Sequence, residues 1–179
     1  MHGVIFASFR DYVTMTYGAE TSREVLEGEP TYMLSEAYGD ERLFGLIART
    51  ATLSGRDVES VIHDFGVFAA QTTFTKLYPA FFAVSPDARS FLLTVENRIH
   101  ELVRATIPNA DPPRLTVSEL GAEGVAIRYD SPRRLCVLLR GLAEGTARHY
   151  GETAEIEETT CMHRGDPECT FRLRFSALA

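Results

Sequence analysis

The spacing of apolar residues changes once along the chain, at the helix-breaking cluster Asn109–Pro113. Before this cluster, apolar residues recur about every 3.6 residues, which is the period of an amphipathic helix. Phe91, Val95 and Ile99 are an example. After the cluster, short apolar runs bounded by glycine, such as 125–129, are typical of strands. We therefore expect an α+β fold, with a mainly helical first part and an antiparallel sheet in the last third.

Capping and turn residues predict where the elements begin and end. The expected helix boundaries are an end at Gly18, starts at Asp40, Asp57 and Ser85-Pro86, an end near Ala105, and a later helix from Ser131-Pro132 to about Tyr150. The expected strands are 115–117, 125–129, 154–158 and 170–175. The helix that begins at Ser131 would then cross over between two halves of the sheet.

Length, charge and cysteine content exclude several classes of protein. The chain has 179 residues, which is typical of one domain, 1–179. With 18 Lys and Arg against 25 Asp and Glu, its net charge of −7 argues against nucleic-acid binding, which needs clustered positive charge. No apolar run approaches the ~18 residues of a membrane span, and the first residues lack the features of a signal peptide. Three cysteines without a secretion signal predict a reducing, cytoplasmic compartment.

The segment Tyr129–Arg133 combines several groups that bind anions. Ser131 and Pro132 are expected to begin a helix, whose N-terminus presents free N–H groups and a positive dipole end. The guanidinium of Arg133 can hold a carboxylate through two hydrogen bonds, and the hydroxyls of Tyr129 and Ser131 add neutral donors. The segment is therefore a candidate carboxylate or phosphate site. An ordinary capped helix with a solvated arginine explains the same residues.

His100 is a candidate metal ligand near the end of the long helix. It lies next to Ile99, at the border of the apolar stripe, where it is either half-exposed or directed into a cavity. The other histidines show no HExxH spacing. Because CxxCH is also absent, any haem would be bound non-covalently.

The three cysteines form a second candidate site. Cys161 and Cys169 have seven residues between them, and Cys136 lies 25 positions before Cys161. Together with Glu158 or His163, they could complete a tetrahedral zinc site. Three buried and inert cysteines explain the same spacing equally well.

Three segments of the chain resemble one family, the haem nitric oxide/oxygen binding (H-NOX) domains, in their stand-alone bacterial type. They are the opening Met1–Phe6 (MHGVIF), the helix segment Glu96–His100 (ENRIH) and the Y-x-S-x-R pattern of Tyr129–Arg133, which begins 29 residues after His100. Signatures of enzymes such as GxSxG, the P-loop and the kinase motifs are absent. The resemblance implies a sensor, and the lack of these signatures agrees with a protein that is not an enzyme.

The resemblance also implies a fold and a cofactor. A mainly helical subdomain, about 1–64, and a subdomain with a four-stranded antiparallel sheet, about 65–179, would hold haem b between them without a covalent bond. The residues that would contact haem are His100 as the axial iron ligand, Tyr129, Ser131 and Arg133 at the propionates, and Pro113, which would distort the macrocycle.

The residues expected on the side of the pocket opposite His100 predict which gas the haem binds. Oxygen-binding members of the family carry a distal tyrosine, whose hydroxyl stabilises the partial negative charge on bound dioxygen. The matching position here is Leu138. The other residues expected at the pocket are Ile5, Phe9, Phe68, Ala69 and Leu142, and none of them donates a hydrogen bond. We expect the haem to bind nitric oxide and carbon monoxide and to exclude oxygen, unless another tyrosine, such as Tyr150, reaches the pocket.

The resemblance further implies a signalling route. Nitric oxide would release the bond between His100 and the iron, and the resulting movement would be sensed by a separate partner, such as a histidine kinase or a cyclic-di-nucleotide enzyme. Residues 1–179 contain no kinase or cyclase region, so the partner is expected to be a separate protein. The cysteine set also resembles a zinc site of some bacterial members, in which histidine occupies the position of Glu158. Two alternatives are a thiol or zinc redox sensor built on Cys136, Cys161 and Cys169, and a haem-free small-molecule-binding module.

Overall fold

The computed structural model describes residues 1–122 and 124–178. Its helical elements are α1 Gly3–Val25, α2 Asp40–Ser54, α3 Val58–Phe68, the π-helical η1 Ala69–Phe74, α4 Thr75–Leu77, α5 Pro79–Ala83, α6 Ala88–Thr94, the π-helical η2 Val95–His100, α7 Glu101–Thr106, α8 Cys136–His149 and the 3₁₀-helical η3 Met162–Arg164. Its strands are β1 Arg114–Leu120, β2 Gly124–Asp130, β3 Glu152–Thr160 and β4 Cys169–Ala177.

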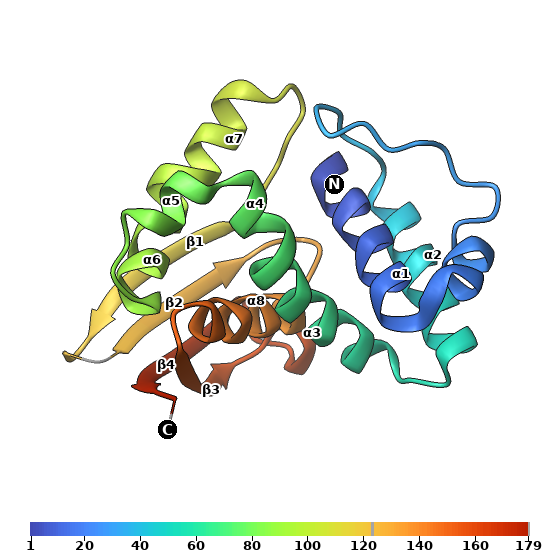
Figure 1. The fold of residues 1–179 in the computed structure, drawn as a ribbon. Helices are drawn as coiled ribbons and strands as arrows, with labels where there is room; N and C mark the ends of the chain where they lie inside the picture. Colours follow the sequence, from blue (N-terminus) through green and yellow to red (C-terminus); the bar gives the residue numbers. More distant parts are fainter. Residues whose placement is uncertain (123, 179) are drawn as a thin grey trace.

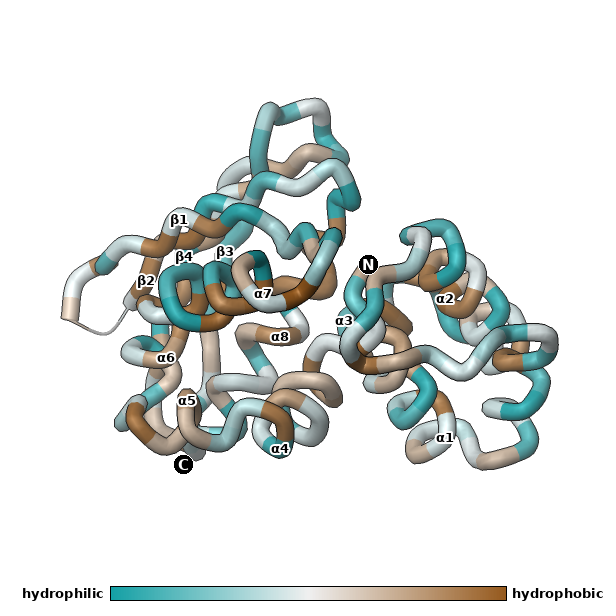
Figure 2. Tube along the Cα trace, turned by 90° about the horizontal axis from the view of Figure 1, so that it is seen from above, coloured by the Kyte–Doolittle hydropathy of each residue, from teal (hydrophilic) through white to brown (hydrophobic). Residues whose placement is uncertain are grey.

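The molecule consists of two lobes. Helices α1 and α2 form one lobe, and the sheet with α5 to α8 forms the other (Figure 1). Seen from above, the two lobes lie side by side, with α3 at their junction (Figure 2). Within the described residues, no helix is both long enough and apolar enough to cross a membrane.

The four strands form one antiparallel sheet in the order β1-β2-β4-β3. Tyr129 of β2 lies opposite Leu115 of β1 on one side and Cys169 of β4 on the other. Alternate residues of the central strands, such as Ile127 and Phe171, are buried in one core with α8. The predicted α+β class is confirmed, and so are all four predicted strands, each of which extends beyond its predicted ends.

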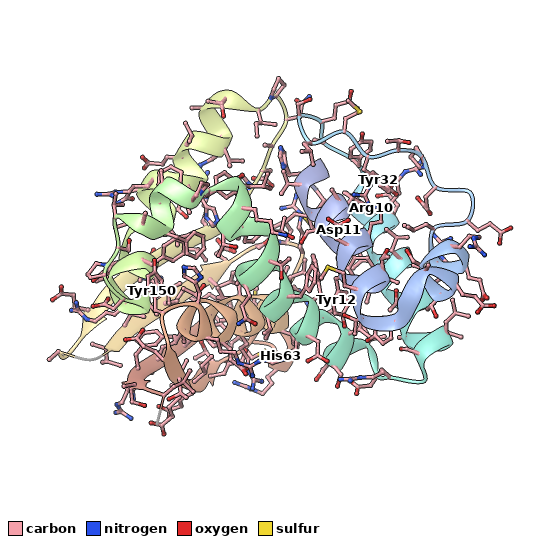
Figure 3. The ribbon with its side chains drawn as sticks, viewed as in Figure 1. Arg10, Asp11, Tyr12, Tyr32, His63 and Tyr150 are labelled. Atoms are coloured by element: carbon pink, nitrogen blue, oxygen red, sulfur yellow. The ribbon has the colours of Figure 1, made fainter. Side chains whose placement is uncertain are left out.

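A second core lies among α1, α2 and α3. Aromatic rings fill much of it: Tyr12 of α1 and Phe65 of α3, with ring centroids 5.7 Å apart, are both fully buried (Figure 3). The predicted helix end at Gly18 is a kink, because Gly18 adopts a φ of 89° and the helix then continues to Val25. Glycine reaches this backbone region without the steric cost that other residues meet.

The backbones of α3 and α8 touch where the two lobes meet. A Cβ atom on Gly141 would lie 2.1 Å from the carbonyl oxygen of His63, and one on Gly66 would lie 2.7 Å from that of Leu138. Only glycine permits this approach at either position. Helix α3 packs both in the helical core and against α8, so its packing does not assign it to one subdomain. The predicted subdomain boundary near residue 64 therefore stays a prediction.

The predicted start of α2 at Asp40 is confirmed, whereas the predicted starts of α6 and α8 are wrong by two and four residues. Gly39 rather than Asp40 is the N-cap of α2. For α6 the N-cap is Asp87, whose carboxylate accepts the N–H of Ser90 at 2.6 Å, and not Ser85. Helix α8 begins at Cys136 and not beside Ser131, because Arg134 takes a left-handed φ of 50°, which a helix cannot contain. The predicted start at Asp57 is confirmed by its hydrogen bond from Ser60.

Candidate functional site

A mainly apolar cavity of about 220 Å³ is bounded by the start of α1, the segment η2–α7, the strands β1 and β2, and α8. The predicted site residues that line it are His100, Pro113, Tyr129, Ser131, Arg133, Ile5, Leu138 and Leu142. The fold thus brings the candidate metal ligand and the candidate anion site into a single cavity.

His100 is the last residue of the π-helical segment η2. Such segments occur often at functional sites. Its Nδ1 lies 2.9 Å from Oε2 of Glu96, and the same carboxylate accepts the N–H of Leu115 at 3.1 Å and a hydrogen bond from Arg104. Burial lowers the pKa of His100 and outweighs the opposing effect of Glu96. A neutral imidazole whose Nδ1 donates to Glu96 retains a lone pair on Nε2 that can bind a metal.

Tyr129 and Ser131 stabilise the turn where β2 ends. The hydroxyl of Tyr129 accepts the N–H of Leu135 at 3.0 Å, and Oγ of Ser131 accepts the N–H of Arg133 at 3.3 Å. Burial raises the pKa of Tyr129, so its hydroxyl stays protonated. Both residues therefore fix a turn before α8 rather than the first turn of a helix.

Arg133 connects the two lobes. Its Nη1 donates to the carbonyl oxygen of Asp111 at 2.6 Å. Its Nε lies 2.7 Å from Oδ2 of Asp40, an ion pair without the geometry of a directed hydrogen bond. Asp40 also receives a hydrogen bond from the amino group of Met1 at 2.7 Å. The predicted propionate-binding arginine is thus linked to the start of both α1 and α2.

Two buried donors at the cavity, Nε2 of His2 and Nε of Arg133, find no hydrogen-bond partner among the described residues. Nδ1 of His2 accepts the N–H of Val4 at 3.3 Å, so the neutral ring carries its proton on Nε2. The unpartnered donor of His2 costs about 1–3 kcal/mol, which an acceptor in the cavity would recover, whereas the charge of Arg133 is already offset by Asp40. Haem fits these residues, because it combines an apolar macrocycle, an iron for His100 and two carboxylates for the donors.

Phe9, Phe68 and Ala69, which the sequence predicts at the haem pocket, lie in the helical core behind the cavity wall. Ala70 and Phe74 line the cavity in their place. The placement of Ala70 and Phe74 reflects the π-helical segment η1, which begins at Ala69. The wider turn of a π-helix rotates the side chains that follow it relative to an α-helical continuation.

The cavity also contains Tyr78, a residue that the sequence analysis did not identify. Tyr78 precedes Pro79, and a residue before proline is restricted away from helical conformations. It accordingly interrupts the helix between α4 and α5 with φ −125° and ψ 43°. The Tyr-Pro pair was the available signal for a bend at this position.

Tyr150, the tyrosine singled out from the sequence, donates its hydroxyl to the carbonyl oxygen of Phe82 at 2.9 Å (Figure 3). It packs beside Phe82 and Phe91 in the sheet core. This hydrogen bond holds it in that core rather than at the cavity.

The comparison with family models decides the family. The model described as Haem-NO-binding matches residues 2–158. The chain belongs to the H-NOX family. The resemblance that the sequence motifs indicated is thereby confirmed.

Solved H-NOX structures share the fold over almost the whole chain. An H-NOX protein from S. oneidensis in the Fe(II)NO ligation state is 26% identical, with a TM-score of 0.90 over 98% of this chain and 99% of that chain. The NMR structure of an H-NOX domain from Shewanella oneidensis in the Fe(II)CO ligation state is 27% identical, with a TM-score of 0.89 and the same coverage. An unliganded Fe(II) H-NOX protein from K. algicida, 24% identical, has the same fold, with a TM-score of 0.84 over 98% of this chain and 97% of that chain. A search among curated proteins found no match.

The cysteines of this H-NOX chain lie together at the start of α8 and the β3–β4 turn. The ligand atoms of Cys136, Glu158, Cys161 and Cys169 all lie within 4.8 Å of one another. His163, the other predicted ligand, is exposed, and its Nε2 contacts the carbonyl oxygen of Arg134 at 2.8 Å. The geometry thus favours Glu158 over His163 as the fourth group.

Cys136 and Cys169 are buried thiols of this cluster whose surroundings favour the protonated form. Burial raises the pKa of Cys136 and of Cys169, and the neighbouring sulfurs raise that of Cys136 further. The thiolate is the form that reacts with oxidants and binds metals. A metal ion at this cluster would therefore have to displace protons on binding.

Proposed function

We propose that this H-NOX chain is a haem-based nitric oxide sensor without catalytic activity of its own. Haem b would bind non-covalently in the cavity, with His100 as the axial ligand and with Tyr129, Ser131 and Arg133 at its propionates. The observation that carries the proposal is the single cavity lined by His100, Pro113 and the Tyr129–Arg133 segment. When bound, haem supplies a ferrous iron with one position open to a diatomic gas.

The residues on the cavity wall support nitric oxide over oxygen. Ile5, Leu138 and Leu142 are apolar, whereas retention of oxygen requires a hydrogen-bond donor near the ligand. The hydroxyl of Thr146 already donates to the carbonyl oxygen of Leu142 at 2.8 Å. Tyr78 is the lining residue whose hydroxyl could oppose this preference. We therefore propose that the chain excludes oxygen. A Tyr78→Phe variant should exclude oxygen as the wild-type chain does.

His100 would act as the signalling tether between the segment η2–α7 and the cofactor. Its release would free the lobe of α1 and α2 to rotate relative to the sheet. The contact that such a rotation would change is the 2.7 Å pair of Arg133 and Asp40, which joins the lobes. Ligand binding shifts this equilibrium only if it favours one of the two arrangements. A separate protein, such as a histidine kinase or a cyclic-di-nucleotide enzyme, would read the difference.

The absorption spectrum of the reconstituted protein tests this function. The ferrous protein should show a strong Soret band that moves with nitric oxide and with carbon monoxide and stays unchanged with oxygen. A His100→Gly variant should lose the axial ligand and resemble the released state in its lobe arrangement, measured by small-angle scattering. A colourless protein after hemin supplementation would contradict haem binding and favour the haem-free small-molecule module. A stable oxygen complex would contradict the proposed selectivity.

A second candidate function rests on the group of Cys136, Glu158, Cys161 and Cys169, whose ligand atoms lie within 4.8 Å of one another. Three sulfurs and one oxygen could hold zinc tetrahedrally. The carboxylate of Glu158 beside the three sulfurs favours a structural metal site over a thiol redox sensor, because a carboxylate can supply the fourth ligand. Elemental analysis of the reduced protein should find zinc, and a Cys169→Ser variant should lose it. Protein without zinc, whose cysteines oxidise readily with peroxide, would instead support the redox sensor.

A further inference from the structure

Glu96 is a half-buried carboxylate of η2 that lies outside the Tyr129–Arg133 segment. It lies one turn before His100 and receives three donors. These are Nδ1 of His100 at 2.9 Å, the N–H of Leu115 at 3.1 Å and the guanidinium of Arg104. Three donors aimed at one carboxylate stabilise its ionised form, since an ionised carboxylate only accepts hydrogen bonds.

This arrangement fixes which nitrogen of His100 carries the proton. Because the carboxylate only accepts, Nδ1 of His100 must donate. The ring is thereby held with its lone pair on Nε2, the nitrogen that remains for a metal. Histidines that bind metals commonly donate their other N–H to such a partner, which orients the ring and increases its basicity.

The contacts of Glu96 reach beyond the helix that carries it. Leu115 belongs to β1, directly after Pro113 and Arg114, so its N–H ties the carboxylate to the edge of the sheet. Arg104 lies two turns further along the same helical segment, and its Nη1 is buried without a hydrogen-bond partner in the described part of the chain. The positive charge of Arg104 beside Glu96 favours the ionised form of that carboxylate.

We infer that Glu96 is the positioning residue of the haem ligand, holding His100 by its Nδ1–H and anchoring it to β1. The inference rests on the proposed haem function. A carboxylate partner makes the imidazole a stronger electron donor. Glu96 therefore strengthens the attachment of His100 to the iron and sets how readily that tether is released.

The test compares the full-length wild-type protein with Glu96→Gln and with Glu101→Gln. Glu101 is the next residue after His100 and is exposed, so its substitution makes the same chemical change on the same segment without touching the ring. Glutamine at position 96 has one acceptor oxygen for three donors and no charge for Arg104. In the ferrous protein, Glu96→Gln should lower the iron–histidine stretching frequency in resonance Raman spectra and raise the reduction potential. It should also weaken haem retention by roughly tenfold to a hundredfold, while Glu101→Gln matches the wild type.

A second measurement needs no variant and can be made even on the haem-free chain. Spectra of ¹⁵N-labelled imidazole in the purified wild-type chain, with and without haem, should show His100 protonated on Nδ1. A wild-type chain that takes up no haem contradicts the proposed function, and the protonated nitrogen then decides the role of Glu96 by itself. Protonation on Nε2 in the haem-free chain overturns the inference. A Glu96→Gln protein that binds haem with the same frequency and potential as Glu101→Gln also overturns it.

Discussion

Two regions of the molecule bury similar apolar side chains: the helical core of α1, α2 and α3, and the region around the cavity. They differ in how closely their side chains pack and in whether their buried donors have hydrogen-bond partners. In the helical core, Phe9 and Tyr12 are fully buried and packed ring against ring with Phe65. Around the cavity, Leu138 is only partly buried, and Nε2 of His2 lacks a hydrogen-bond partner among the described residues. The first region is close-packed by its own side chains, whereas the second leaves a cavity that the proposed haem would fill.

Truncation in the two regions should therefore have unequal effects on the haem-free protein. We expect Phe9→Ala to reduce the free energy of unfolding by about 3–5 kcal/mol, because it leaves a cavity among close-packed rings. Leu138→Ala should cost about 2 kcal/mol or less, since the leucine already faces a void and has fewer contacts to lose. Urea unfolding measures both values. Equal losses would mean that the cavity wall is packed as tightly as the helical core.

Haem should stabilise the cavity region selectively. At a free haem concentration 100-fold above the dissociation constant, binding should add about 2.7 kcal/mol, which corresponds to a rise in Tm of about 5–10 °C for a chain of this size. Hydrogen exchange should slow in η2–α7 and β1 more than in α2. Uniform protection of all helices would show that the two regions form one cooperative unit.

A hydrogen-bond donor on the cavity wall should change gas selectivity. Leu138→Tyr should improve oxygen affinity by roughly tenfold to a hundredfold, equivalent to ~1.5–3 kcal/mol for a hydrogen bond to a charged acceptor. Leu138→Phe, which adds the ring without the hydroxyl, is the matched control. Oxygen titration of the ferrous proteins distinguishes them. If both variants bind oxygen equally, size and not hydrogen bonding controls the ligand.

Acid should weaken the helical lobe through Glu29, with the smallest effect of the four. Burial alone would raise the pKa of Glu29, but hydrogen bonds from Tyr32 and Arg49 outweigh it and lower the pKa. Its contribution to stability is therefore present above the pKa of an unfolded glutamate, about 4.3, and is lost as the pH falls through the lower folded value. A Glu29→Gln variant should lose part of this acid dependence in pH-dependent urea unfolding. Glu27→Gln, at an exposed position, should retain it.

Local sequence patterns predicted which helices and strands form better than they predicted the residue at which each helix begins. Asp57 caps α3 as expected, because an N-cap is decided by residues within one turn. Asp40 has the same chemistry but does not cap, since its carboxylate is taken by the amine of Met1 and lies against Arg133, partners far away in sequence. Nothing in the sequence revealed the π-helical turn of η1, which places Ala70 and Phe74 at the cavity.

The sequence by itself determined the class of fold, the four strands and the motif residues His100, Tyr129, Ser131 and Arg133, because periodicity, turn chemistry and motif spacing are properties of neighbouring residues. Only the tertiary structure decided which side chains share the cavity, that Tyr78 and His2 are among them, and that Glu96 joins His100 to β1. Those relations depend on the approach of segments that are distant along the chain. That approach is governed by packing and by two π-helical turns, which leave no periodic signal in the sequence.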